Sequence, residues 1–451
     1  MVPREDAVDP TPPSPDAHRR IVIERVARRL VPFAFICYVV AYIDRVNIGF
    51  AASALQKDLG LSATQFGIGA GLFFFGYCLF EIPSNLILAR VGARRWIARI
   101  MIAWGVVSMG MIFVTDVRSF YTARIVLGIA EAGFFPGMVL YLTYWIPAAD
   151  RARTGALFMM AAPVAVIVGS PVSEMLLKLH GWWGLKGWQW LFIGEGLPAV
   201  VLGVLALRVL TDTPEKAAWL PLNQREWLVA TMRREQAERI SHHRSSLLLT
   251  LAAPRVWLLT SVYFLNTVVT YGIFLWLPKI LRDASGASGI RLSVMTMIPF
   301  VAALIAMVII GRHSDRTGER KWHVAACAIT AAAGLVMASL FHDNVLLLVL
   351  SFTLSQIGQR SVVGVFWAIP PIFLGGTAAA AGIAMINAVG NLGGALGPSV
   401  MGWLRDVTGA YQGGLLVLAS ALVLEAILVV SLNVPPAKHA APVAAAPQPA
   451  R

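Results

Sequence analysis

Ionisable residues with a candidate role stand inside long apolar stretches of this chain: Asp44, Arg45, Arg124, Glu131 and Arg360. Placing such a group at the centre of a lipid bilayer costs at least about 2.5–3.5 kcal/mol, so it persists mostly where it has a function or a structural partner. A guanidinium is a planar, permanently charged donor that suits a carboxylate. A carboxyl group partly shielded from water can bind and release a proton. These residue types indicate anion binding combined with proton movement, with structural ion pairing as the alternative.

Arg124 and Glu131 are seven residues apart, which places them about 10 Å apart on one face of a helix. We expect Arg124 to hold Glu131 or Asp44 in the charged form in one state of the protein. A clamp between helices is the alternative for Arg124. Asp44 and Arg45 are neighbours that point about 100° apart on a helix, so they need not pair with each other.

Tyr77, Glu81 and Asn85 recur at i, i+4 and i+8 and form one polar stripe. Tyr77 lies deepest in its apolar segment and is a candidate hydrogen-bond donor to a carboxylate. Glu81 and Asn85 lie nearer the end of the segment, where packing or gating is the favoured interpretation.

Gln356, Arg360 and Trp367 share the face of another helix. Arg360 is either a second cation for a second carboxylate or a structural partner of an acid such as Glu425. Trp367 is a wall residue that can stack on an aromatic or sugar-acid face. Asn391 lies among glycines, where a broken or closely packed helix would present its amide to a ligand.

The composition indicates what kind of structural element holds these residues. The 451 residues are 57% hydrophobic and 14% charged, with a mean hydropathy of +0.70. A soluble domain carries about 25% charged residues, so this chain could not cover its surface with polar groups in water. Three cysteines in apolar stretches exclude a disulfide scaffold. The sequence therefore predicts an all-α polytopic membrane protein.

Twelve apolar segments of about the length needed to cross a bilayer fall into two groups of six. We expect a cytoplasmic N-terminal segment with a short amphipathic surface helix at 19–29, two six-helix halves, a central cytoplasmic loop, and a disordered cytoplasmic tail. These parts cover residues 1–29, 30–210, 211–255, 256–433 and 434–451.

With both termini in the cytoplasm, the cytoplasmic parts hold about 26 Lys and Arg residues, and the opposite loops hold about 8. This bias supports that orientation. It also accounts for most of the formal net charge of +13 without a nucleic-acid partner.

An internal repeat supports two related halves. Residues 85–96 read NLILARVGARRW and residues 311–322 read GRHSDRTGERKW, an offset of 226. Such a duplication is typical of transporter folds. Gly311 and Gly318 would allow close approach and a tight turn, and Asp315 would interact with exposed N–H groups at a helix end. The arginines would form charge pairs that break when the halves move. The candidate gating residues are Gly311, Asp315, Arg316, Gly318, Arg320, Arg90, Gly92 and Arg94.

The second copy resembles the signature G-x-x-x-D-R-x-G-x-R-[RK] of the major facilitator superfamily, whereas the first copy has Asn85 and Ala89 at the usual Gly and Asp positions. Within that superfamily the chain resembles the anion:cation symporter branch of tartrate, phthalate, hexuronate and hydroxyphenylacetate carriers. The segments that carry this resemblance are 42–51 (YIDRVNIGFA), 80–86 (FEIPSNL), 124–137 (RIVLGIAEAGFFPG), 187–199 (GWQWLFIGEGLPA), 212–220 (DTPEKAAWL), 366–374 (FWAIPPIFL) and 386–398 (INAVGNLGGALGP).

The resemblance implies a twelve-helix importer of a small organic carboxylate in a bacterial inner membrane, monomeric, driven by the proton gradient and without a cofactor, metal or enzymatic activity. By resemblance, Arg45 and Asn391 bind the substrate and Asp44 and Glu131 carry protons. Tyr77, Gln356, Arg360 and Trp367 complete the expected substrate site, and Arg124 the proton-coupling group. The alternatives are a proton-driven exporter of drugs or metabolites on the same fold, and a transporter-like sensor.

Overall fold

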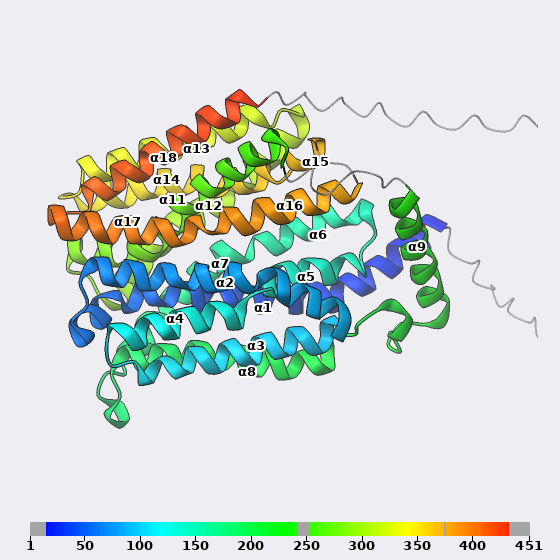
Figure 1. Ribbon diagram of the computed structural model, residues 1–451, viewed down its shortest axis with the longest axis horizontal. Coiled ribbons are helices and arrows are strands. Elements are labelled where there is room, and N and C mark those ends of the chain that lie inside the picture. Colours follow the sequence, from blue (N-terminus) through cyan, green and yellow to red (C-terminus); the bar gives the residue numbers. More distant parts are fainter. Residues whose placement is uncertain (1–14, 242–251, 374–375, 433–451) are drawn as a thin grey trace, which may run out of the picture.

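The structure is a computed structural model that describes residues 15–241, 252–373 and 376–432. Over these residues the chain is helical and contains no β-strand (Figure 1). Most of the helices run nearly parallel or antiparallel to one long axis. Eleven of them are long and apolar enough to cross a membrane. The predicted all-α membrane fold is therefore confirmed.

The N-terminal half contains the six segments expected from the sequence, two of which are broken into shorter helices. Its helices are α1 (Pro15–Leu59), α2 (Ala63–Val91), α3 (Ala93–Met109), α4 (Val117–Glu131), α5 (Phe134–Thr143), α6 (Ala148–Met159), α7 (Ala161–Leu177) and α8 (Gly187–Val209), with 3-10 turns at Gly110–Phe113 and Trp182–Gly184.

Helix α9 (Leu222–Ser241), preceded by the 3-10 turn Pro214–Lys216, connects the halves. The C-terminal half consists of α11 (Pro254–Ser285), α12 (Gly289–Thr317), α13 (Lys321–Leu340), α14 (Val345–Phe366), α15 (Pro370–Phe373), α16 (Gly376–Asn391), α17 (Gly393–Thr408) and α18 (Gln412–Ser431). The eleventh apolar segment, expected at about 375–403, is thus divided between α16 and α17, neither of which alone has the length of a membrane span.

The break between α4 and α5 follows from the residues at 131–133. Gly133 has φ +84°, a conformation that is unstrained only for glycine. A Cβ on Gly133 would also lie 2.3 Å from the Ser84 hydroxyl, so α2 packs directly on this turn. The break leaves Glu131 as the last residue of α4, inside the protein.

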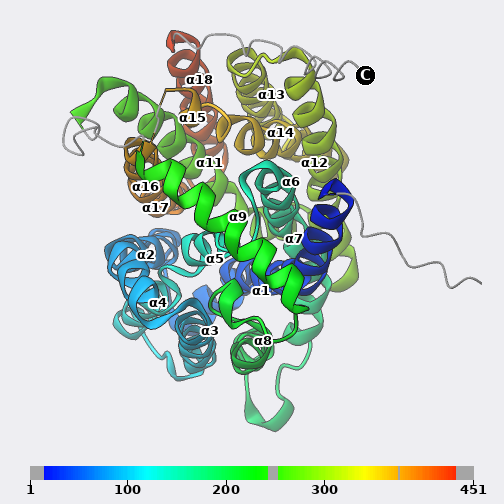
Figure 2. The ribbon, with the colours of Figure 1, turned by 90° about the vertical axis from the view of Figure 1, so that its right-hand side faces the viewer.

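Figure 2 shows the N-half and C-half helices as two groups, with α9 crossing one end of the bundle. We call this end the α9 end. The opposite end, with the turns at 60–62, 178–186 and 409–411, is called the far end. Contacts between the halves are made chiefly by three helix pairs: α2 with α17, α7 with α12, and α1 with α11.

The start of the chain differs from the expectation of a separate surface helix at 19–29. These residues continue without interruption into α1. Val22, Val26 and Leu30 are completely buried at helical spacing, so this apolar stripe packs against the protein. Residues 1–14, 242–251 and 433–451, including the predicted disordered tail, lie outside the described residues.

Candidate functional site

A cavity of about 70 Å³ lies between the two halves, near the middle of the bundle. Its wall combines aromatic hydroxyls, amides and one guanidinium from α1, α6, α7, α11, α12 and α14. The lining residues used below are Tyr38, Tyr42, Asn266, Thr270, Tyr271 and Arg360. Such a cavity, mostly apolar with a few convergent polar groups, is the usual form of a small-molecule site.

Arg45 lies beside this cavity and is paired with a carboxylate. Its Nε donates to Glu131 Oε1 over 2.7 Å, and its Nη2 is 2.5 Å from the same oxygen. Its Nη1 donates to the Tyr271 hydroxyl at 3.3 Å, and that residue lines the cavity. Both ionic side chains are buried, and Glu131 Oε2 has no hydrogen-bond partner. Thus the expected substrate ligand and the expected proton carrier are held together in this state.

Asp44 points away from Arg45 and lies in a separate polar group. Its Oδ1 accepts hydrogen bonds from the Ser108 hydroxyl and from Asn47 Nδ2. Arg124 is also buried, and its Nε and Nη1 lack hydrogen-bond partners. Among the described residues Arg124 forms no ion pair, and its guanidinium lies 5.2 Å from the Phe73 ring centroid. The expected hold of Arg124 on Glu131 or Asp44 is therefore not formed here: Arg45 holds Glu131.

Arg360 is the guanidinium that lines the cavity. It donates through Nε to Gln356 Oε1 at 3.2 Å and lies over the rings of Phe274 and Phe300. In the part of the chain that the structure describes, no carboxylate lies within ion-pair distance of it. The alternative pairing with Glu425 is wrong, because Glu425 accepts hydrogen bonds from Asn266 instead.

The remaining expected substrate residues are distributed around this centre. The Tyr77 ring centroid lies 5.0 Å from the Arg45 guanidinium carbon. Trp367 packs edge-on against Tyr263, at 4.9 Å between ring centroids. Tyr263 lines the cavity, whereas Trp367 lies behind it and is not part of the lining. Asn391 ends α16, outside the lining, and its side chain makes no hydrogen bond with the residues described. The structure thus brings Arg45, Glu131, Tyr77, Arg360 and Gln356 near the cavity, but not Asn391.

The candidate gating residues lie at the α9 end. Gly318 has φ +67° and closes α12, as a tight turn requires. Gly311, however, has no atom within 4 Å of where a Cβ would lie, so the expected close approach is not made here. Asp315 pairs with Arg320 at 2.6 Å, rather than with helix N–H groups.

In the first copy of the repeat, Asp212 takes the place of the absent motif aspartate. Its Oδ1 accepts from the backbone N–H of Arg94, next to Gly92, which has φ +95°. Arg90 and Arg316 are exposed and form no ion pair with any described residue. None of these contacts joins the two halves.

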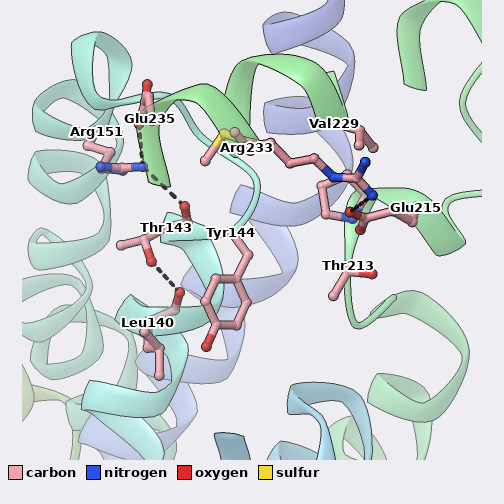
Figure 3. Close-up of a pocket in the computed structure, with 11 residues that line it drawn as sticks. Leu140, Thr143, Tyr144, Arg151, Thr213, Glu215, Val229, Arg233 and Glu235 are labelled. Atoms are coloured by element: carbon pink, nitrogen blue, oxygen red, sulfur yellow. Dashed lines mark hydrogen bonds and ion pairs between the residues drawn. The ribbon is translucent and has the colours of Figure 1, made fainter. Parts of the chain in front are cut away.

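A larger cavity, of about 360 Å³, lies at the α9 end between α5, α6 and α9 (Figure 3). Its charged residues neutralise each other in pairs: Arg151 with Glu235 at 2.9 Å and Arg233 with Glu215 at 3.5 Å. The Arg151–Glu235 contact attaches α9 to the N-terminal half. Because the charges of this cavity are already paired and it lies beside the connecting segment rather than between the two halves, it is a weaker substrate site than the central cavity despite its size.

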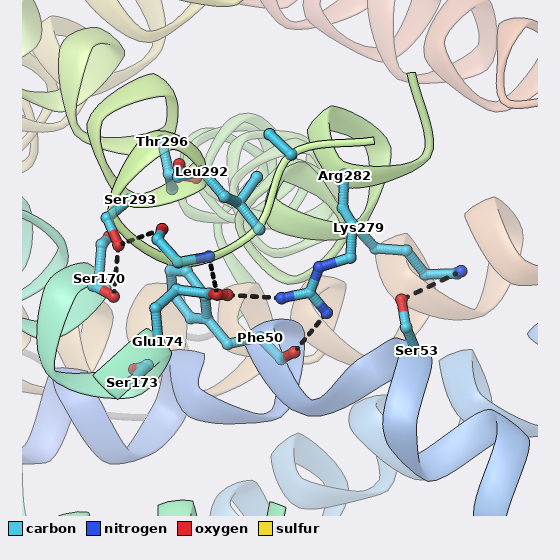
Figure 4. A network of polar contacts seen from close by, with 12 residues as sticks. Phe50, Ser53, Ser170, Ser173, Glu174, Lys279, Arg282, Leu292, Ser293 and Thr296 are labelled. Carbon is cyan, nitrogen blue, oxygen red and sulfur yellow. Dashed lines mark hydrogen bonds and ion pairs between the residues drawn. The ribbon is translucent and has the colours of Figure 1, made fainter. Parts of the chain in front are cut away.

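The far end is closed by polar contacts between the halves (Figure 4). Glu174 of α7 accepts from Arg282 Nη2 of α11 at 2.5 Å and from the N–H of Gly289 of α12 at 2.7 Å. Asp406 of α17 accepts from the N–H groups of Ala63 and Thr64 of α2, at 3.0 and 2.7 Å. Each acid therefore caps the first turn of a helix from the other half.

Toward the α9 end the contacts between halves are fewer. Asn387 of α16 donates to Glu81 of α2 at 2.6 Å, and Cys78 donates to the Ala388 carbonyl at 3.2 Å. Within the described ranges these are the hydrogen bonds between halves nearest the α9 end. This supports the packing and gating interpretation of Glu81 from the sequence.

Besides Glu174 at the far end, sequence reasoning missed two buried acids. Glu195 of α8 accepts from the Ser173 hydroxyl at 2.6 Å, within the N-terminal half. Glu425 of α18 was considered only as a partner of Arg360. Both stand in apolar segments of the sequence, and the same criterion that selected Asp44 and Glu131 would have found them.

Two helical halves that enclose a central polar cavity define a multi-pass membrane transporter. The sequence model of the Major Facilitator Superfamily matches residues 34–373 and 281–451. The chain belongs to the major facilitator superfamily, and it is a transporter rather than an enzyme.

Individual relatives agree with this assignment. The chain is 50% identical to a "Putative tartrate transporter" of Agrobacterium vitis, over 91% of this chain and 94% of the relative. It is 39% identical to a "Quinolone resistance transporter" of Acinetobacter baumannii, over 90% and 94%. The xylose transporter XylE from E. coli, in a partially occluded inward open conformation, has the same fold: the TM-score is 0.74 at 15% identity, covering 90% of this chain and 97% of that chain.

Proposed function

We propose that the chain is a proton-coupled importer of a small organic carboxylate that works by alternating access. A sugar acid, a tartrate-like dicarboxylate or an aromatic acid would fit the cavity chemistry. The observation that carries this proposal is the pair of arginines at the cavity: Arg360, in the cavity wall, has no carboxylate partner among the described residues, while Arg45, beside the cavity, is occupied by Glu131. The name of the Agrobacterium relative supports the same substrate class.

Coupling follows from competition for Arg45. While Glu131 is ionised it holds Arg45, and a substrate carboxylate would have to displace a buried ion pair. When Glu131 takes up a proton, its attraction for Arg45 falls and the guanidinium becomes available for the substrate. The incoming proton and the bound anion together add no net charge to the site. This lack of added charge favours the occluded state through which alternating access passes.

Two cations from different halves would then hold the substrate. Arg45 belongs to α1 and Arg360 to α14, and the rings of Tyr42 and Phe274, 6.2 Å apart, lie between them. A carboxylate on Arg45 and a second polar group on Arg360 would draw the halves together. Hydroxyls of Tyr271 and Thr270 would accept or donate to hydroxyl groups of the substrate. Asp44, close to Ser108 and Asn47, remains a proposed second proton carrier of the N-terminal half.

The orientation is also part of the proposal. The excess of Lys and Arg on the α9 side places that end, with both termini, in the cytoplasm of a bacterium. The contacts of Glu174 and Asp406 then close the periplasmic side, and the structure represents a state that faces inward. A monomer would suffice, because Arg360 in the cavity wall and Arg45 beside it come from one chain.

Proton-coupled uptake can be measured in proteoliposomes loaded with a pH-sensitive dye. The acids added would be tartrate, galactonate, glucuronate, hydroxyphenylacetate and phthalate, with protein-free vesicles as the control for leakage of weak acids. We expect acidification of the lumen with one class of acid and no response to the others. Binding of an acid without acidification would refute proton coupling, and silence to every acid would refute the substrate class.

An exporter of drugs or metabolites is the second candidate, supported by the name of the Acinetobacter relative. The aromatic cavity wall, with Tyr38, Tyr42, Tyr263 and Tyr271, would accept a flat ring. Arg360 in the same wall favours anionic or zwitterionic compounds over purely cationic drugs. Proton release on addition of such drugs, with no response to the acids, would establish this function instead.

A further inference from the structure

Glu425 is a buried acid that the mechanism above does not use. It lies in the middle of α18 and is completely inaccessible to solvent. Asn266 Nδ2 donates to its two oxygens, at 3.1 and 3.5 Å, and is the hydrogen-bond donor that reaches it among the described residues. A carboxylate without a cation is expensive to bury, so this environment favours a group that carries a proton for part of the cycle.

The groups facing Glu425 do not supply a compensating charge. Of the helices packed against α18, α13 contributes the thiol of Cys327, and α11 contributes the amide of Asn266. The charged residues of α17 near its end, Arg405 and Asp406, are engaged elsewhere, with the Tyr411 ring and with the start of α2. Arg360 of α14 is bonded to Gln356 instead.

A chain of amides and hydroxyls connects Glu425 to the central cavity. Asn266 lines the cavity, and its Oδ1 accepts from the Thr270 hydroxyl at 3.4 Å. Gln359 Nε2 donates to the backbone carbonyl of Asn266 at 2.9 Å and to Thr270 Oγ1 at 2.7 Å. A change at Glu425 therefore reaches the cavity wall at Asn266 itself and, through the Asn266 side chain, at Thr270.

Protonation would reverse the hydrogen bonding at this position. An ionised carboxylate only accepts, so it holds the Asn266 NH₂ group and leaves Oδ1 toward Thr270. A protonated carboxyl can donate to Oδ1, and the amide would then turn its NH₂ group toward Thr270 and the cavity. At Asn266 the cavity wall would then present a hydrogen-bond donor in place of a hydrogen-bond acceptor, and a donor suits an anionic substrate.

We propose that Glu425 is a proton-binding site of the C-terminal half, whose occupancy sets what Asn266 presents to the substrate. This rests on the proposed proton coupling and adds a proton to the one on Glu131. With a monoanionic substrate, the extra proton makes transport electrogenic, so the membrane potential would drive uptake.

Infrared difference spectroscopy of the detergent-solubilised protein tests the site without requiring transport. We expect a carboxylic-acid band that changes with pH and with added substrate in the wild type. It should be absent in Glu425→Gln, an isosteric change that keeps the volume of the side chain. The matched control is Glu226→Gln, at an exposed position of α9. Asn266→Ala should keep the band but shift its frequency, because Glu425 loses its donor.

Flux measurements supply the second readout. In proteoliposomes, uptake by the wild type should depend on membrane potential, and Glu425→Gln should lose one charge per substrate while still exchanging substrate across the membrane. An unchanged carboxylic-acid band, or an unchanged charge per substrate in this variant, would overturn the proposal. If instead the band titrates in the wild type but no acid produces proton uptake, the Glu425 site stands and the proposed function fails.

Discussion

Neutralising Glu174 should open the far end of the protein. The Glu174 carboxylate accepts a hydrogen bond from Arg282 at 2.5 Å and another from the N–H of Gly289 at 2.7 Å. Its side chain is 5% exposed, whereas that of Arg282 is 22% exposed. In Glu174→Gln the amide oxygen can keep one weaker contact, the negative charge at the start of α12 is lost, and the NH₂ group faces the other donor.

The size of the effect follows from these contacts. Hydrogen bonds to a charged group contribute about 1.5–3 kcal/mol each, and breaking a fully buried ion pair costs about 3–5 kcal/mol. Partial exposure of Arg282 lowers this figure, so we expect a loss of about 2–3 kcal/mol. Because the two partners lie in different halves, the loss falls on the state with a closed far end. Every 1.4 kcal/mol is a factor of ten in an equilibrium constant, so the equilibrium should move about thirty- to a hundred-and-fiftyfold toward the open far end.

Distances between paired spin labels report this change directly. Lys57 of α1 and Ala284 of α11 are exposed on opposite halves near the far end. The labels require a background in which Cys37, Cys78 and Cys327 are replaced. We expect Glu174→Gln to broaden the distance distribution toward longer values, and the exposed control Glu226→Gln to leave it unchanged.

The double exchange Glu174→Arg with Arg282→Glu separates the two contributions. It restores an ion pair between the halves but leaves the N–H of Gly289 without its carboxylate, so it should recover only part of the closed population. An unchanged distance distribution in Glu174→Gln would refute the reasoning, since the two strongest polar contacts at this end would then contribute nothing to closure.

Three further outcomes are expected. Glu131→Gln should preserve substrate exchange and abolish uphill uptake, because Arg45 is freed without a proton; uptake that stays proton-driven would exclude Glu131 as the carrier. Arg360→Gln should weaken substrate binding about tenfold to a hundredfold, as for a lost hydrogen bond to a charged group, measured by calorimetry; unchanged affinity would make Arg360 structural. Burial alone would raise the pKa of Asp406, but hydrogen bonds from Thr64 and Ala63 outweigh it and lower the pKa. The stability that the Asp406 carboxylate gives to the start of α2 is therefore fully present at pH values above the usual pKa range of aspartate, and it is lost as pH falls through the lowered pKa. Acidification should then lengthen the distance between the spin labels. An unchanged distance on acidification would contradict this role of Asp406.

The sequence predicted the fold because the signal for a membrane span is long and strong. Twelve apolar segments and a repeat at an offset of 226 residues indicated two related halves. The breaks inside segments were harder to place. Gly133 is one of many glycines in apolar segments, and only its packing against Ser84 shows why the chain turns there.

The candidate residues were found more reliably than their partners. Apolar context alone was enough to select Arg45, Glu131 and Arg360. Which acid meets which base depends on how α1, α4 and α14 are placed in space, and the sequence separation of 86 between Arg45 and Glu131 carries no signal for their pairing. For the same reason Arg124 was expected to hold Glu131, a role that Arg45 takes in this state.

The far end also shows what the repeat contributes to closure. Gly289 lies 226 residues after Ala63, which is the offset of the repeat, and both begin a helix whose N–H group is capped by an acid from the other half. Glu174 and Asp406 thus make equivalent contacts in opposite directions. At the α9 end, by contrast, Asp315 pairs within its own loop. Because the far-end caps are formed and the motif residues at the α9 end make no described contact between the halves, we expect the opposite state to release both caps together, and a variant of either acid to favour the same open far end.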